Sequence, residues 1–135
     1  MADAFQLEIL TPEKTYFTGD VDLMTITTAK GEITLLPNHV DYIADIVISK
    51  LYLEIRKQRF VYAISGGALT FDQKKNAAKL FVYAIESKDE IDLERALKAK
   101  ENADSLLQSA ASLRDSKRAE VKLKRALNRI DVKRG

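Results

Sequence analysis

The chain of 135 residues contains no cysteine, a single histidine and two prolines. The absence of cysteine excludes disulfide bonds and thiolate metal ligands, and one histidine cannot build a histidine-based metal cluster. No apolar run approaches the roughly 18 residues that a membrane-spanning helix needs. The first residues run directly into a strand pattern, so we expect no signal or transit peptide. Any link to a membrane is therefore expected to pass through a partner.

Candidate catalytic groups are scarce as well. His39 follows a Pro-Asn turn and has no cysteine or second histidine to pair with, so a structural role is favoured over a catalytic one. Ser65-Gly66-Gly67 lacks the flanking residues of a nucleophile elbow or a P-loop, and a bulge or tight turn explains it better. We find no set of residues that predicts an enzyme.

Residues 1–86 have the pattern of short strands separated by turns. Apolar residues alternate with polar ones over 5–9 and again over 51–55. A charged turn then leads into the apolar run 60–64, which predicts a hairpin ended by Ser65-Gly66-Gly67. Several strands of this length predict an antiparallel β-sandwich.

Residues 87–135 follow a different pattern, without proline and without internal glycine. Apolar residues recur at steps of three and four, as on one face of a helix. The polar stretch 112–116 predicts a turn, so we expect an antiparallel hairpin of two helices, each about 20 residues long. Because alanine buries little area, roughly a few kcal/mol would hold this hairpin together. The expected contact positions are Ala96, Ala99, Ala103, Leu106, Ala110, Leu113, Ala119, Leu123, Ala126 and Ile130.

The net charge of +2 is unevenly distributed. Residues 1–86 carry 9 Lys and Arg against 11 Asp and Glu, whereas residues 114–135 carry 9 against 3. The basic end therefore favours an acidic partner. A solvated basic face and a nucleic-acid interface are the alternatives. The second lacks the stacking platforms of single-strand binders, because no aromatic residue follows Tyr83.

Asp92 lies close to the expected start of the first helix, and two interpretations of it are open. As an N-cap, Asp92 would stabilise the helix by about 0.5–2 kcal/mol, and Arg95 would be a solvated side chain. As part of a ligand site, Asp92 would accept a hydrogen bond from a base amine, and Arg95 would bind a phosphate. The spacing alone favours the cap.

Four stretches, in this order and spacing, carry a resemblance to a known family. They are Leu7-Glu8-Ile9-Leu10-Thr11-Pro12-Glu13-Lys14, residues 31–39 with their Leu36-Pro37-Asn38-His39 end, Ser65-Gly66-Gly67, and Ile91-Asp92-Leu93-Glu94-Arg95-Ala96. Over essentially its full length the chain resembles the ε subunits of bacterial F-type ATP synthases.

The resemblance implies a non-catalytic subunit of the central stalk that couples rotation to proton translocation. The β-sandwich, residues 1–86, would bind the γ subunit and the c-ring. The helical hairpin, residues 87–135, would inhibit ATP hydrolysis at the α and β subunits. The location implied is the cytoplasmic face of the bacterial plasma membrane, reached through the complex, with no nucleic acid bound. The residues expected to meet an acidic segment of β are Lys117, Arg118, Lys122, Lys124 and Arg125.

Some bacterial members of that family bind ATP at the hairpin, which makes ATP a candidate regulatory ligand although no cofactor is required. Asn102 departs from those members, which often carry an arginine there, and the loss of a charged phosphate contact costs about 1.5–3 kcal/mol. A stand-alone ATP-sensing module is the alternative function. The residues that match the ATP-binding members are Glu86, Ile91, Asp92, Arg95, Ala96, Arg125 and Arg129.

Overall fold

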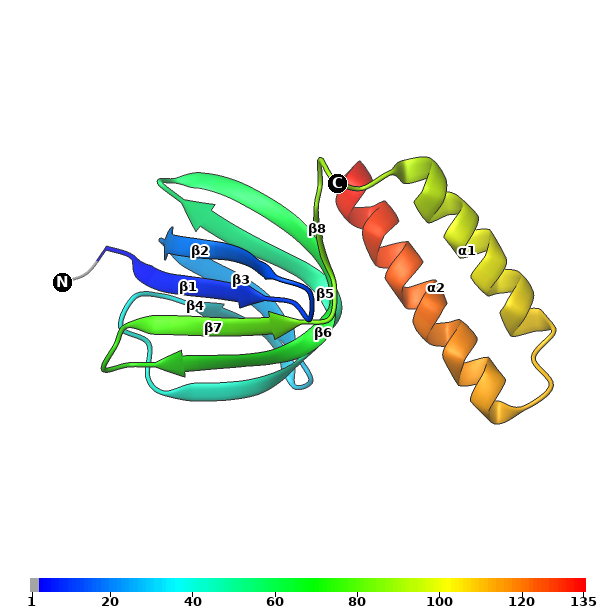
Figure 1. Cartoon of the computed structure of the whole chain (residues 1–135), viewed down its shortest axis with the longest axis horizontal. Helices are drawn as coiled ribbons and strands as arrows, with labels where there is room; N and C mark the ends of the chain where they lie inside the picture. The colour runs from blue at the N-terminus through cyan, green and yellow to red at the C-terminus, as the bar shows by residue number, and fades with distance from the viewer. Residues whose placement is uncertain (1–2) are drawn as a thin grey trace. The chain divides into compact units, whose positions relative to one another are not determined.

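The computed structural model in Figure 1 describes residues 3–135, in which eight strands are followed by two helices. The chain divides into two compact units, one ending at Ser87 and the other beginning at Lys88. The expected β-sandwich followed by an antiparallel two-helix hairpin is confirmed. The elements are β1 (Phe5–Leu10), β2 (Thr15–Val21), β3 (Leu23–Thr28), β4 (Gly31–Leu35), β5 (Tyr42–Ile55), β6 (Gln58–Asp72), β7 (Ala77–Val82), β8 (Ile85–Ser87), α1 (Leu93–Gln108) and α2 (Leu113–Arg134).

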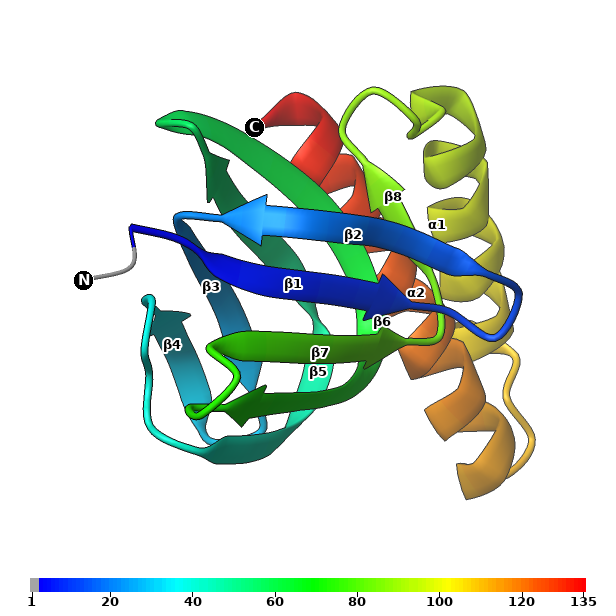
Figure 2. The ribbon, with the colours of Figure 1, turned by 60° about the vertical axis from the view of Figure 1, so that its left-hand side comes forward.

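The strands hydrogen-bond in the order β2-β1-β7-β6-β5-β3-β4, and β8 pairs with β6. The β1–β7 pair is parallel, and the remaining pairs are antiparallel. β5 buries Ile46 and then Leu51 and Leu53, so its inward alternation changes parity along the strand. The long strands β5 and β6 bend together, and the strands therefore close over a shared interior (Figure 2).

The first unit has a core of its own, built only from its strands. Fully buried side chains such as Leu7, Met24 and Leu69 come from different strands of the sheet. Phe5 and Phe71 meet edge to face with ring centroids 5.3 Å apart. Because none of this core comes from the helices, the sandwich has its own source of stability.

Ser65-Gly66-Gly67 does not end a strand, so that prediction was wrong. β6 runs through all three residues, pairing with β8 from Tyr62 to Ile64 and with β7 from Gly67 to Asp72. Gly66 has φ +105°, and a Cβ on Gly67 would lie 1.8 Å from the carbonyl oxygen of Phe81. The glycines permit a local irregularity and a close strand approach inside a continuous strand.

The two helices of the second unit are joined by a turn at 109–112, not at the predicted 112–116. The Ser112 side chain accepts a hydrogen bond from the backbone N–H of Asp115 at 3.1 Å, so this serine caps the start of α2. Leu113 is 72% exposed and Leu106 47% exposed, which corrects their expected place in the contact. The most buried positions of the helices are mostly small ones, Ala96, Ala103, Ala119 and Ala126, together with Val132.

Neither helix in the described part of the chain combines the length and the apolarity needed to cross a bilayer.

Candidate functional site in the helical hairpin

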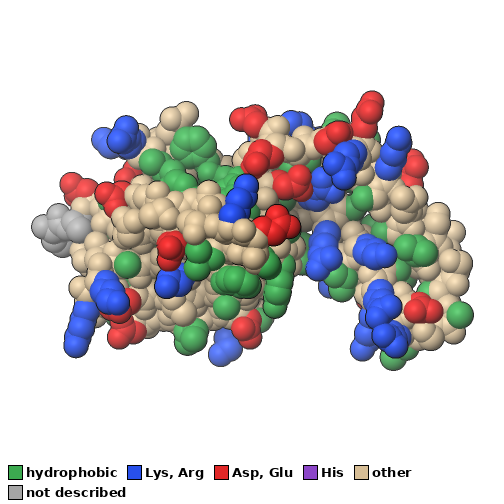
Figure 3. Space-filling view, viewed as in Figure 1, with side chains coloured by type: hydrophobic (Ala, Val, Ile, Leu, Met, Phe, Trp, Pro, Cys, Tyr) green, Lys and Arg blue, Asp and Glu red, His purple; other side chains and the backbone are tan. Residues whose placement is uncertain are grey.

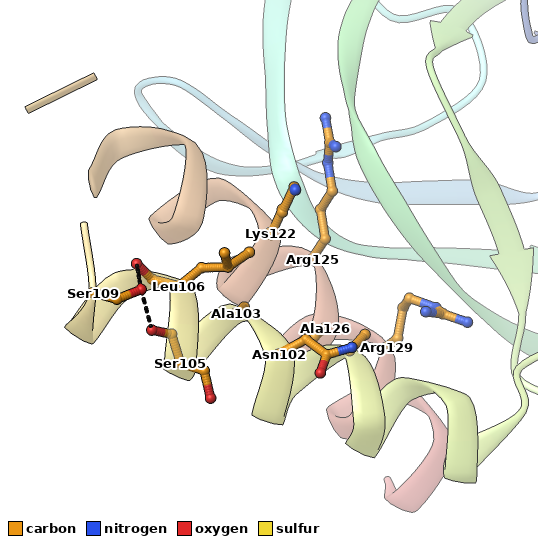
Figure 4. A pocket seen from close by; sticks show the side chains of 10 residues that line it. Asn102, Ala103, Ser105, Leu106, Ser109, Lys122, Arg125, Ala126 and Arg129 are labelled. Atoms are coloured by element: carbon orange, nitrogen blue, oxygen red, sulfur yellow. Dashed lines mark hydrogen bonds between the residues drawn. The ribbon is translucent and has the colours of Figure 1, made fainter. Parts of the chain in front are cut away.

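A groove of ≈ 680 Å³ runs along one side of the hairpin, with walls from both helices (Figure 4). Alanines at its base, Ala103 and Ala126, are almost completely buried, and their small side chains let the two helices approach closely. We call it the hairpin groove. Its lining residues are Ala99, Asn102, Ala103, Ser105, Leu106, Ser109, Lys122, Arg125, Ala126 and Arg129.

The charged side chains of the hairpin groove all come from α2, and all are cationic. Lys122, Arg125 and Arg129 are spaced three and four residues apart, which places them on one helix face. No Asp or Glu is three or four residues from any of them. The opposite wall, from α1, contributes Asn102, Ser105 and Ser109, which are polar and uncharged. The hairpin groove is therefore suited to an anion.

Figure 4 shows Lys122 and Arg125 extending from the same side of α2. On the other wall, the Ser109 hydroxyl donates to the backbone carbonyl of Ser105 at 3.0 Å. Ser109 is also the C-cap of α1, with its backbone N–H bonded to the same carbonyl. The turn end of the groove is thus fixed by local hydrogen bonds.

The residues expected to bind ATP do not all lie in the hairpin groove. Arg125 and Arg129 line it. Asp92 is the N-cap of α1, and its Oδ1 accepts a hydrogen bond from the backbone N–H of Arg95 at 3.2 Å. Arg95 is exposed and lies four residues before Ala99, on the stripe of α1 that faces the groove.

The other three residues predicted to bind ATP do not line the hairpin groove. Ile91 and Ala96 are 2% and 0% exposed, so their side chains serve packing in this arrangement. Glu86 belongs to β8 and hence to the first unit. The structure therefore brings together the two α2 arginines and Asn102, whereas Asp92 helps to start α1.

Most of the residues expected to meet an acidic partner lie close together on α2. One shallow hollow is lined by Lys117, Arg118, Lys122 and Arg125, and the last two also line the hairpin groove. Lys124 is two residues from Lys122, which turns it about 160° away around the helix. All five are exposed, and Figure 3 shows the blue Lys and Arg side chains gathered over α2.

The end of α2 is tied to the segment that enters the hairpin. Lys133 donates from Nζ to the backbone carbonyl of Lys88 at 3.0 Å, and the Lys88 ammonium donates to the carbonyl of Gly135. Cations near a helix C-terminus satisfy its last carbonyls and complement its dipole. The sequence analysis missed this clasp, although the lysine at 133 and arginine at 134 were a local signal for it.

A second candidate surface lies on the outer face of β5, β6 and β7, which we call the sheet patch. Pairing aligns Ala68 of β6 with Phe81 of β7, and the Phe81 and Tyr83 rings are 6.1 Å apart. Ile43 is 77% exposed and Tyr83 66%. Exposed apolar groups in such numbers mark an interaction surface. The sheet patch consists of Ile43, Val47, Ala68, Phe81 and Tyr83.

His39 has the surroundings of a structural residue. Its Nδ1 lies 2.8 Å from the carbonyl oxygen of Val40, and its ring meets those of Tyr42 and Phe71 edge to face. Within residues 3–135, no three His, Cys, Asp or Glu side chains are grouped closely enough to hold a metal ion.

Comparison with known proteins shows matches along nearly the whole chain. The family described as "ATP synthase, Delta/Epsilon chain, beta-sandwich domain" matches residues 4–82. The family described as "ATP synthase, Delta/Epsilon chain, long alpha-helix domain" matches residues 89–134. The division between the compact units falls in the short interval, residues 83–88, between the two matches.

Bacterial relatives named "ATP synthase epsilon chain" are similar over nearly their full lengths. The Ruminococcus albus protein is 37% identical, over 95% of this chain and 95% of the relative. The Halalkalibacterium halodurans protein is 35% identical, over 93% and 94%. A chain in the Euglena gracilis mitochondrial ATP synthase superposes with a TM-score of 0.81 at 22% identity, covering 92% of this chain and 78% of that one. This last likeness concerns the fold.

Proposed function

Because the chain belongs to the family of ATP synthase δ/ε chains, we propose that it is a non-catalytic subunit of the central stalk. Its β-sandwich couples rotation to proton translocation by binding γ and the c-ring, and its hairpin inhibits ATP hydrolysis at the α and β subunits. The separation into two compact units at Ser87 carries this proposal. The protein then acts at the cytoplasmic face of the bacterial plasma membrane, held there by the complex.

The packing of the hairpin supports a regulatory role. Most of its buried positions are alanines, Ala96, Ala103, Ala119 and Ala126, which bury far less apolar area than leucines would. A seam of this kind is weak, so a ligand or partner that prefers one arrangement of the helices shifts the population toward it. The hairpin is in this way suited to respond to its surroundings.

The sheet patch supports binding of the γ subunit. Phe81 and Ile43 are exposed on the same sheet face, so covering them with a partner gains free energy. Phe81→Lys is expected to prevent co-purification with γ. Phe60→Lys is the control, because Phe60 is 37% exposed but lies in the first residues of β6, outside the sheet patch. Equal recovery of γ with both variants would exclude the sheet patch as this interface.

The cations of α2 support inhibition through an acidic surface of the β subunit. Reversing the charge of exposed Arg118 turns attraction into repulsion at such a contact. In F1 complexes depleted of their own ε subunit and supplemented with this chain, Arg118→Glu is expected to raise the ATP hydrolysis rate. Lys74→Glu, an equal charge change in the exposed β6–β7 turn, should leave the rate as it is. Identical rates for the two variants would contradict this role.

ATP binding at the hairpin is the second part of the proposal. The three cations of the hairpin groove, and Arg95 on its adjoining stripe, support it. Calorimetry with the whole chain tests it: ATP should bind, and Arg95→Ala should weaken binding. Lys124→Ala removes the same charge from the far side of α2 and serves as control. If millimolar ATP gives no heat of binding, the proposal of ATP binding is wrong, and regulation depends on contacts with the γ and β subunits alone.

A stand-alone ATP-sensing module is the alternative that the hairpin groove also favours. It requires the same ATP affinity but no complex with other subunits. Co-purification of γ with the whole chain would exclude it, whereas ATP binding without any γ binding would favour it over the stalk subunit.

A further inference from the structure

The clasp, the pair of hydrogen bonds that joins Lys88 to Lys133 and Gly135, lies at the end of the hairpin opposite the turn. The chain itself connects α1 to α2 at 109–112, so the two helices can separate only from the clasp end (Figure 1). We propose that the clasp is a latch, which must release before α2 can swing away from α1. This opening is the step that the proposed function needs for regulation, and the latch rests on that function in this respect alone.

The two hydrogen bonds of the clasp are reciprocal. Lys133 donates from Nζ to the backbone carbonyl of Lys88 at 3.0 Å, and Lys88 donates from its own Nζ to the carbonyl of Gly135. Both donors are ammonium groups, which makes each bond stronger than one between neutral groups. The bond from Lys133 is also partly buried, so water competes with it less than with a fully exposed pair. The end of α2 is therefore held to the entry of α1 at two points.

The packing of the hairpin is uneven along its length. Toward the clasp end, Ile91 and Ile130 are only 2% and 8% exposed, whereas Leu106 and Leu113 beside the turn are 47% and 72% exposed. The larger buried side chains of the hairpin thus lie where opening has to begin, and the clasp lies over the same end. Release of the clasp should accordingly expose Ile130 before the alanines nearer the turn.

Lys133 and Arg134 form a matched pair for testing the latch. Both cations lie in the last turn of α2, where they complement the helix dipole. Arg134 is exposed, and its side chain makes no hydrogen bond or ion pair within residues 3–135. Loss of either charge removes a similar interaction with the dipole, but only the loss of Lys133 breaks the clasp.

The test uses the absence of cysteine from the chain, because Ile130→Cys then places a single thiol on the buried face of α2. A disulfide reagent such as DTNB reaches this thiol only when the hairpin opens, so the reaction rate reports the open fraction. In this background Lys133→Met should raise the rate about three- to tenfold, the effect of losing one partly exposed charged hydrogen bond. Lys88→Met should raise it as well, whereas Arg134→Met should change it less than twofold. Circular dichroism verifies that each variant keeps its helices.

Equal thiol rates for Lys133→Met and Arg134→Met would overturn the latch, since charge near the helix end would then explain the whole effect. ATP hydrolysis by reconstituted F1 complexes, measured with the same two substitutions in the cysteine-free chain, separates the latch from the proposed function. A hydrolysis rate that differs between them, together with the faster thiol reaction, supports a latch that regulates the enzyme. If only the thiol rate differs, the latch is supported, and the proposed regulation through hairpin opening is wrong.

Discussion

Asp92 and Arg95, the two residues with the sharpest expected ligand roles, are joined to each other by the hydrogen bond that starts α1. The backbone N–H of Arg95 donates to Oδ1 of Asp92 at 3.2 Å. The cap interpretation of Asp92 is therefore confirmed. A ligand role is compatible with it, since the second carboxylate oxygen has further acceptor capacity, and that role stays a prediction.

Removal of this cap should destabilise the hairpin. Asp92→Ala is expected to lower the free energy of unfolding by about 1 kcal/mol, because an N-terminal N–H of α1 loses its acceptor. Urea unfolding followed by circular dichroism at 222 nm measures it. Asp92→Ser keeps an acceptor at the cap and should stay within about 0.5 kcal/mol of the unaltered chain. ATP binding by Asp92→Ser as tight as before would leave the cap as the only role of Asp92.

Gly67 should tolerate no side chain. A Cβ there would lie 1.8 Å from the carbonyl oxygen of Phe81. Neither atom can move away unless the backbone itself shifts. Gly67→Ala is expected to destabilise the sandwich by about 3 kcal/mol, because β6 and β7 must separate locally. Gly19→Ala is the control, since its Cβ meets only the flexible ring of Phe17 at 3.2 Å. Chemical denaturation of both variants measures the difference, and similar midpoints would contradict the close approach.

Thr28 should depend on its hydroxyl. It is 4% exposed, donates from Oγ1 to the carbonyl of Gly31 at 2.9 Å, and accepts from the N–H of Lys30 at 3.0 Å. Thr28→Val keeps the shape but leaves both backbone groups without this partner, at a cost of about 1–3 kcal/mol. Thr28→Ser retains the hydroxyl and should lose less. A lower melting temperature for Thr28→Ser than for Thr28→Val would contradict the role of the hydrogen bonds.

The alanine seam of the hairpin should reject larger side chains. Ala103 is 1% exposed, so Ala103→Leu forces α1 and α2 apart and costs about 1–3 kcal/mol. The same substitution at exposed Ala111, in the turn, is the control. Hydrogen exchange of the α1 amides measures the effect, which should be faster exchange in Ala103→Leu alone. Unchanged protection would show that the seam has room to spare.

The periodic elements could be predicted from the sequence, because their pattern follows local rules. The alternation at 51–55 and 60–64 lies in the paired strands β5 and β6, joined by a turn in which Arg56 and Lys57 have positive φ. The full length of β5 was not foreseen. Its buried positions change parity between Ile46 and Leu51, and a strand that bends between two layers loses the simple period of two.

The candidate site was only partly predictable, since sequence spacing does not determine which faces meet. The basic residues of α2 were treated as one surface, whereas helix geometry separates Lys124 from Lys122. Leu113 was expected in the seam, but Ser112 caps α2 and leaves Leu113 exposed. The hairpin groove depends on the empty space above Ala103 and Ala126, and only the packed structure shows that space.

The most direct test of the account is ATP hydrolysis by F1 complexes reconstituted with the whole chain or with a chain that stops after Ser87. The sandwich has a complete core without the hairpin, so the shorter chain should fold and bind γ. Its equal incorporation is verified by gel before rates are compared. The account predicts a higher hydrolysis rate for complexes that lack the hairpin. Equal rates at equal incorporation would contradict the proposal that the hairpin restrains the enzyme.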